Sequence, residues 1–150
     1  MLNRRSTVSL FLLSWLAACK ASTGADAPEA ASPTVACPSQ DFRTFLTAFA
    51  NEPGVQEAFT RRPLQSDYVD AAANPEPRRV HRTLDGADLQ FPVMPSLQRQ
   101  QQRGLEMRLT PNGDDKVEVV LVKPDTDDQT AYFFIREGCW KLDRIRDDSL

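Results

Sequence analysis

The sequence predicts an α+β domain in which N-terminal helices pack into a curved antiparallel sheet. Apolar residues recur at helical spacing around position 45, and four apolar-rich runs separated by turn residues fill the chain from residue 105 onward. Helices followed by a series of strands favour an α+β architecture, because a sheet that wraps a helix buries the apolar faces of both. We expect these elements to form one globular domain over residues 37–150.

The start of the chain has the features of an export signal. Arg4 and Arg5 form a short basic region, and the apolar run over residues 7–15 is too short to span a bilayer, which takes about 20 residues. The run ends in Leu16-Ala17-Ala18-Cys19, which resembles the lipobox of bacterial lipoproteins. The resemblance implies a signal peptide at residues 1–18 and lipidation of Cys19 after cleavage. The alternative is an ordinary secretory signal in which Cys19 is incidental.

Lipidation would anchor the mature chain to a membrane on the periplasmic side, since two or more acyl chains anchor stably. Lys20 follows the cysteine at a position where an aspartate would resemble the inner-membrane retention signal, so we expect the outer membrane. Residues 19–36 comprise Cys19 and a segment of small, polar and proline residues that cannot bury enough apolar surface to fold. We predict that this segment is a flexible tether, spanning about 20–25 Å as a random coil.

Two cysteines remain once Cys19 is lipidated. Cys37 and Cys139 would both lie in an oxidising compartment, and the chain contains no Cys-x-x-Cys motif. We therefore predict a structural disulfide between them, with two free thiols or a redox pair as the alternatives. The bridge would close a loop of about 100 residues, worth roughly 2–4 kcal/mol in the chain-entropy model.

The first part of the domain is predicted to hold two helices and two strands. The first helix is expected to be capped by Ser39, to carry Asp41 in its first turn and to end at Asn51 and Pro53-Gly54, with one apolar face formed by Phe42, Phe45, Leu46 and Phe49. A second short helix is predicted over residues 55–61, and strands over 64–69 and 80–84. Residues 92–104 are compatible with either a polar helix or a loop.

The second part of the domain is predicted to be an antiparallel meander. Its four strands are expected at residues 105–110, 116–123, 129–136 and 139–146, separated by Pro111-Asn112-Gly113-Asp114, Pro124-Asp125-Thr126-Asp127 and Glu137-Gly138.

Successive hairpin turns lie at opposite ends of a sheet, so the 124–128 turn and the chain terminus should share one end. That end gathers Asp125, Asp127, Asp128, Asp147 and Asp148. We consider two interpretations, a solvated end that limits aggregation and an acidic docking surface for a basic protein partner.

Both ends of the domain resemble one protein family. The segment Phe42-x-x-Phe45-Leu46-x-x-Phe49, with the later pairs Val55-Gln56, Thr60-Arg61 and Pro63-Leu64, resembles the opening of small periplasmic lipoproteins that are predicted to share the cone-shaped nuclear-transport-factor-2-like (cystatin-like) fold. Residues 132–145 are similar to the last hairpin of that cone. Some similar lipoproteins are immunity proteins against toxins injected by type IV or type VI secretion, so the resemblance implies a cognate toxin as partner.

Few groups in the sequence suggest chemistry. His81 is the single histidine, no cluster has metal-ligand spacing, and there is no glycine-rich phosphate loop, so we expect neither a metal nor a cofactor. The formal net charge of −3 argues against nucleic acid as a partner. Gln56 and Arg61 recur beside the apolar helix face, which suggests either the mouth of a cone cavity or ordinary capping and surface pairing.

Three functions follow from these observations. We expect a lipid-anchored binding protein that neutralises a toxin in the periplasm, and not an enzyme. The second hypothesis is a small-ligand or envelope-assembly lipoprotein that uses the cavity of the cone. The third is an isomerase- or hydrolase-like enzyme, for which the available groups are Asp67, Tyr68, Asp70 and His81.

Overall fold

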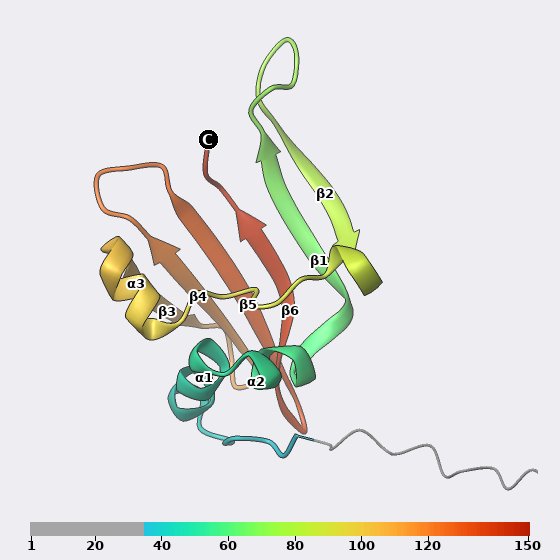
Figure 1. Cartoon of the computed structure of the whole chain (residues 1–150), viewed down its shortest axis with the longest axis vertical. Coiled ribbons are helices and arrows are strands. Elements are labelled where there is room, and N and C mark those ends of the chain that lie inside the picture. The colour runs from blue at the N-terminus through green and yellow to red at the C-terminus, as the bar shows by residue number, and fades with distance from the viewer. Residues whose placement is uncertain (1–34) are drawn as a thin grey trace, which may run out of the picture. The chain divides into compact units, whose positions relative to one another are not determined.

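The computed structural model describes residues 35–150 (Figure 1). The predicted signal peptide, Cys19 and all but the last two residues of the predicted tether lie outside the described residues. The elements, in chain order, are α1 (Phe42–Asn51), α2 (Pro53–Ala58), β1 (Thr60–Asp70), β2 (Arg78–Leu84), the short 3-10 helix η1 (Gly86–Asp88), α3 (Leu97–Arg103), β3 (Glu106–Pro111), β4 (Lys116–Val122), β5 (Gln129–Glu137) and β6 (Cys139–Asp147).

Helix α1 begins where predicted but uses a different cap. Asp41 is the N-cap, because its carboxylate accepts hydrogen bonds from the backbone N–H of Thr44 at 2.9 Å and from the Thr44 hydroxyl at 2.8 Å. These hydrogen bonds lower the pKa of Asp41. The predicted cap, Ser39, instead accepts from the backbone N–H of Asp41 at 3.0 Å, so that prediction is wrong by two residues.

The second helix is shorter than predicted. Pro53 is the first residue of α2, a position at which no intrahelical hydrogen bond needs its missing N–H. Pro53 therefore begins α2 in addition to marking the end of α1. The helix ends at Ala58 instead of Arg61, because Thr60 already pairs with Leu142 and draws the chain into the sheet. Among residues 92–104, α3 forms a short helix that Ser96 caps and Gly104 ends at a φ of 67°.

The apolar face of α1 forms the centre of the core. Phe45 and Phe49 are fully buried, and their ring centroids lie 6.1 and 5.2 Å from that of Phe134 on β5, both in edge-to-face geometry. Aromatic pairs of this kind contribute about 0.5–1.5 kcal/mol beyond the burial of their area. The periodic phenylalanines therefore hold α1 against the sheet, as the helical spacing predicted.

The sheet has six strands in the order β2-β1-β6-β5-β4-β3. The predicted meander is confirmed, since β3 to β6 pair antiparallel in sequence and each begins and ends within one residue of its predicted range. The prediction of a wholly antiparallel sheet is wrong, because β1 and β6 are parallel. Both strands start at the end of the sheet where α2 and the β5–β6 turn lie, so they run in the same direction when they meet (Figure 1).

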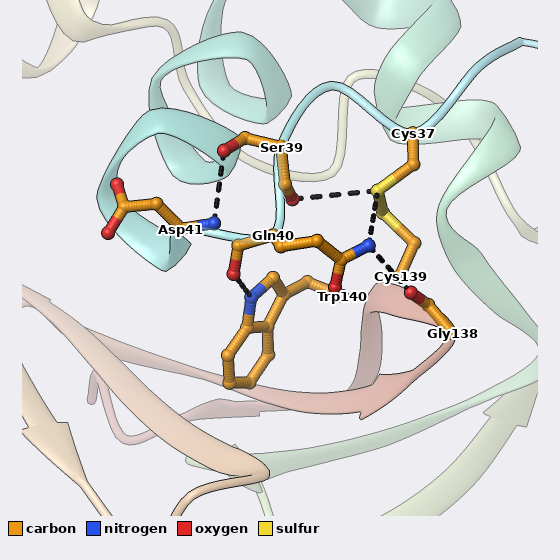
Figure 2. Close-up of a disulfide and its surroundings, with 7 residues drawn as sticks. All are labelled: Cys37, Ser39, Gln40, Asp41, Gly138, Cys139 and Trp140. Carbon is orange, nitrogen blue, oxygen red and sulfur yellow. Dashed lines mark hydrogen bonds between the residues drawn. A yellow bond between two sulfur atoms is a disulfide. The ribbon is translucent and has the colours of Figure 1, made fainter.

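The predicted disulfide joins Cys37 to Cys139, with the two Cα atoms 5.8 Å apart. Figure 2 shows the contacts around it: Gln40 Nε2 donates to the carbonyl of Gly138 at 2.8 Å, and Trp140 Nε1 donates to the carbonyl of Gln40 at 2.9 Å. Gly138 has a φ of 74°, which the tight β5–β6 turn requires. The disulfide and these hydrogen bonds therefore link the start of the domain to its last hairpin.

Removal of this bridge should lower the free energy of unfolding by about 2–5 kcal/mol, because the unfolded chain gains the freedom of a long loop. The change is Cys37→Ser with Cys139→Ser, made in the mature chain with Cys19→Ser to prevent lipidation. Urea unfolding followed by tryptophan fluorescence measures the difference, and reduction of the parent chain provides the control. Equal stability with and without the bridge would contradict a structural role.

Candidate functional site

The two faces of the sheet have different surroundings. Side chains that alternate toward the helices, among them Leu64, Val119 and Phe134, are fully buried. We call this side the helix face, and Figure 1 shows α1, α2 and α3 on it. The opposite side, the outer face, carries no helix within the described residues 35–150 (Figure 1). Its strands present the side chains of Asp67, Arg79, Glu118, Phe133, Arg144 and Arg146.

The five predicted acidic residues lie at one end of the sheet, as the meander geometry implied. The β4–β5 turn and the C-terminus share this end, and the β5–β6 turn lies at the other (Figure 1). Asp125 and Asp127 are exposed on the turn. Asp128 pairs with Arg103 of α3 at 3.1 Å. Two carboxylates of this turn have no ion-pair partner among the described residues. The other three carboxylates at this end face arginines or border a hollow on one of the two sheet faces.

Asp147 and Asp148 project to different faces of the sheet. Asp147 borders a hollow on the helix face, and Asp148 borders one on the outer face. Asp148 accepts hydrogen bonds from Arg79 Nη2 at 2.6 Å and Arg146 Nε at 2.9 Å. Partial burial raises the pKa of Asp148, but these hydrogen bonds and the two positive charges outweigh it, so the pKa is lowered overall. Strand pairing brings Arg79 there from β2, so spacing along the chain could not reveal it, whereas Arg146 lies two residues before Asp148 and was overlooked.

Gln56 is an internal clamp. Its side chain is fully buried, and its amide makes two hydrogen bonds to the backbone of Met94: Nε2 donates to the carbonyl at 2.9 Å and Oε1 accepts from the N–H at 3.0 Å. Gln56 therefore does not border an opening, contrary to the interpretation that placed it at a cavity mouth. Its amide satisfies both polar groups of a buried residue in the loop between η1 and α3.

Arg61 lies apart from Gln56, at the surface near the β5–β6 turn. Its guanidinium bonds to Asp143 at 2.8 Å and lies 3.7 Å from Glu137. The hydrogen bond to Asp143 and the charge of Glu137 raise the pKa of Arg61. It borders a shallow hollow with Thr60, Arg62 and Lys141. Arg61 therefore takes part in ion pairing at the surface, which was one of the two interpretations drawn from the sequence.

A hollow of about 290 Å³ lies on the helix face between the β1–β2 hairpin and strands β5 and β6. The Arg82 guanidinium stacks 4.8 Å from the ring centroid of Tyr68. Burial, with a smaller effect from the charge of Asp147, raises the pKa of Tyr132, so its phenol stays protonated at neutral pH and can donate a hydrogen bond. A guanidinium, a carboxylate and hydroxyls could together bind a small polar ligand. The lining residues are Ser66, Tyr68, Arg82, Leu84, Val93, Thr130, Tyr132, Ile145 and Asp147.

The groups considered for an enzyme do not converge on this hollow. Asp67 and His81 face each other across β1 and β2, with Asp67 Oδ1 2.7 Å from His81 Nδ1, and Asp67 borders the hollow of the outer face. Asp70 accepts a hydrogen bond from the backbone N–H of Ala72 at the hairpin turn. Of the four, Tyr68 alone lines the helix-face hollow.

Residues 35–150 contain no group of three or more His, Cys, Asp or Glu side chains placed to hold a metal ion. Over the same residues, no helix is both long and apolar enough to cross a membrane.

Comparison with known proteins identifies the fold. Neither protein-family models nor curated protein sequences match the chain. Among solved structures, the chain is similar to an NTF2-like protein from Bacteroides fragilis, with a TM-score of 0.52 and 16% sequence identity. The alignment covers 75% of this chain and 48% of that one, so this chain spans about half the length of the matched protein. The likeness shows an NTF2-like α+β fold, which confirms the fold that the residue pattern resembled.

Replacing Gln56 with alanine should lower the free energy of unfolding by about 3 kcal/mol, because the change leaves a cavity and two buried backbone groups of Met94 without partners. Gln98→Ala, on the exposed side of α3, is the matched control and should change the free energy by less than about 0.5 kcal/mol. Thermal and urea unfolding measure both. Similar effects of the two substitutions would show that the buried clamp does not matter for stability.

Replacing Asp148 with asparagine should destabilise the domain at neutral pH but not in acid. The lowered pKa means that the folded state favours ionised Asp148, so its contribution is present above about pH 4 and is lost as the pH falls through the folded-state value. Urea unfolding across this range should show the parent and Asp148→Asn curves converging in acid. Asp114→Asn, on an exposed turn, is the control. A difference that stays constant down to about pH 2 would contradict the assignment.

Proposed function

We propose that this protein is a membrane-anchored periplasmic lipoprotein that binds and neutralises a cognate antibacterial toxin delivered by a secretion system. The lipobox-like run before Cys19 and the polar segment after it support a lipid anchor on a tether. The Cys37–Cys139 disulfide suits an oxidising compartment such as the periplasm.

The observation that carries the proposal is the position of the disulfide. The bridge and Gln40 hold the start of the domain against the β5–β6 turn. The β4–β5 turn, which carries Asp125 and Asp127, lies at the opposite end of the sheet (Figure 1). A domain tethered through residues 19–36 would therefore present its acidic turn away from the attachment point. Soluble toxin could reach that turn without competing with the membrane.

The mechanism that fits this arrangement is occlusion. A basic region of the toxin would be steered to Asp125 and Asp127 by charge, which raises the rate of association without requiring deep burial. The docked domain would then cover the toxin's active cleft or the path of its substrate. No group of this chain needs to react for such inhibition.

A second candidate function uses the hollow of the helix face. Tyr68, Arg82 and Asp147 converge there, which favours a small polar ligand. The hollow of about 290 Å³ is at the lower limit of ligand sites, which run from about 300 to 1,000 Å³, so we place this function second.

Capture from lysate of the source cells tests the proposal. The mature chain with Cys19→Ser, tagged and immobilised, should retain one stoichiometric protein with a lytic domain, and that protein's activity should be lost in the complex. Charge reversal by Asp125→Lys and Asp127→Lys should weaken the complex about tenfold or more at low salt. Glu52→Lys with Asp114→Lys makes the same charge change elsewhere on the surface and is the matched control.

Unchanged affinity after charge reversal at the turn would show that the acidic end is not part of the interface. Retention of a small molecule, with no protein partner, would instead favour the ligand-binding function of the helix-face hollow.

A further inference from the structure

The outer face carries a stacked pair of arginines on an aromatic ring. Phe133 of β5 lies opposite Arg144 of β6 in the sheet register. The guanidinium carbon of Arg144 is 4.2 Å from the ring centroid of Phe133, and that of Arg146 is 5.1 Å away. At these distances the ring attracts both cations and limits the motion of their guanidinium groups.

The two arginines differ in their charge partners. Arg146 pairs with Glu118 at 3.2 Å and with Asp148 at 2.9 Å, and Asp148 also pairs with Arg79. This network contains two cations and two carboxylates, so it is balanced. Arg144 is different, because no carboxylate within residues 35–150 lies at ion-pair distance from its guanidinium. No side-chain hydrogen bond within the same residues involves that guanidinium either. Its N–H donors therefore have no side-chain or backbone acceptor among the described residues.

Arg144 also has a central position between two hollows of the outer face. One, of about 730 Å³, is bordered by Asp67, Arg79 and Asp148, and the other, of about 450 Å³, by Thr110, Phe133 and Ile135; Arg144 borders both. Phe133, Ile135 and the neighbouring Val120 are half-buried, which leaves an apolar strip beside the guanidinium. Lys116, at the edge of the second hollow, adds a further positive charge.

We propose that the outer face is a docking surface for an acidic segment of a protein partner, in which a carboxylate binds Arg144 and an apolar side chain packs on the Phe133 strip. The proposal deepens the proposed toxin-binding function by naming a second surface, of opposite charge to the Asp125–Asp127 turn. A guanidinium already held against an aromatic ring loses little freedom when it donates two hydrogen bonds to a carboxylate.

The surrounding charges favour a protein carboxylate over a polyanion. Glu118 and Asp148 already balance Arg146 and Arg79, so this network leaves Arg144 as the cation for a partner, and a nucleic acid or an anionic membrane would bring many more negative charges than it can neutralise. A single carboxylate flanked by apolar side chains would meet Arg144 alone. A second copy of this chain would place like-charged arginines near each other across a symmetric contact.

The test uses a blocked synthetic peptide of alternating glutamate and leucine as the probe. NMR titration of the mature chain with Cys19→Ser, at low salt, should give saturable shifts of amides around Phe133 and Arg144. Arg144→Gln should weaken peptide binding about tenfold or more, and Arg144→Lys should recover only part of it because the planar fork is lost. Arg99→Gln, on the exposed side of α3, is the control and should bind as the parent does.

Equal binding by Arg144→Gln, shifts confined to the helix face, or peptide-independent self-association through β5 and β6 would each overturn the proposal. The peptide assay needs no toxin, so the two proposals fail separately. A captured toxin with full affinity for Arg144→Gln would leave the proposed function standing and remove this surface. Peptide binding at Arg144 without any captured toxin would support this docking surface and remove the proposed toxin-binding function.

Discussion

The arrangement of the domain depends on the link between its first residues and its last hairpin. The Cys37–Cys139 bridge joins positions 102 residues apart, and hydrogen bonds of Gln40 and Trp140 on either side of it fix the same junction (Figure 2). Asp41 caps α1 immediately afterwards, so the helix starts at a fixed point on the sheet. Phe45 and Phe49 then meet Phe134, which is on the strand that leads into the bridged turn.

This junction also determines which surfaces remain available. The helices cover one face of the sheet, so the outer face carries no helix among the described residues, and the β4–β5 turn at the end farthest from the bridge is exposed (Figure 1). Charge is divided between them: Asp125 and Asp127 stand at the far end, whereas Arg144 on the outer face has no carboxylate partner among residues 35–150. Under the proposed function, two surfaces of opposite charge would fix the orientation of the partner as well as attract it, since wrong orientations bring like charges together.

The sequence predicted the features that depend on local pattern. The meander, its turns and the helical face of Phe45 and Phe49 follow from periodicity and turn chemistry, and the bridge follows from the two cysteines left in a chain that we predict to be exported. The parallel contact of β1 with β6 could not be predicted, because spacing shows where strands lie but not which hairpin edge docks on which. For the same reason the sequence could not place Arg79 beside Asp148. The buried amide of Gln56 could not be predicted either, because it depends on Met94, whose loop has no periodic signal.

The proposed function is that a lipid-anchored form of this protein protects a cell from a toxin in the periplasm, and contact killing between sibling cells tests it most directly. A strain that lacks the protein should lose viability when mixed with secretion-competent siblings and should survive when the parent chain is restored. Restoration by a chain with Cys19→Ser should be weaker, because the unanchored domain is not held where the toxin arrives. Equal survival of the strain with and without the protein would contradict the account.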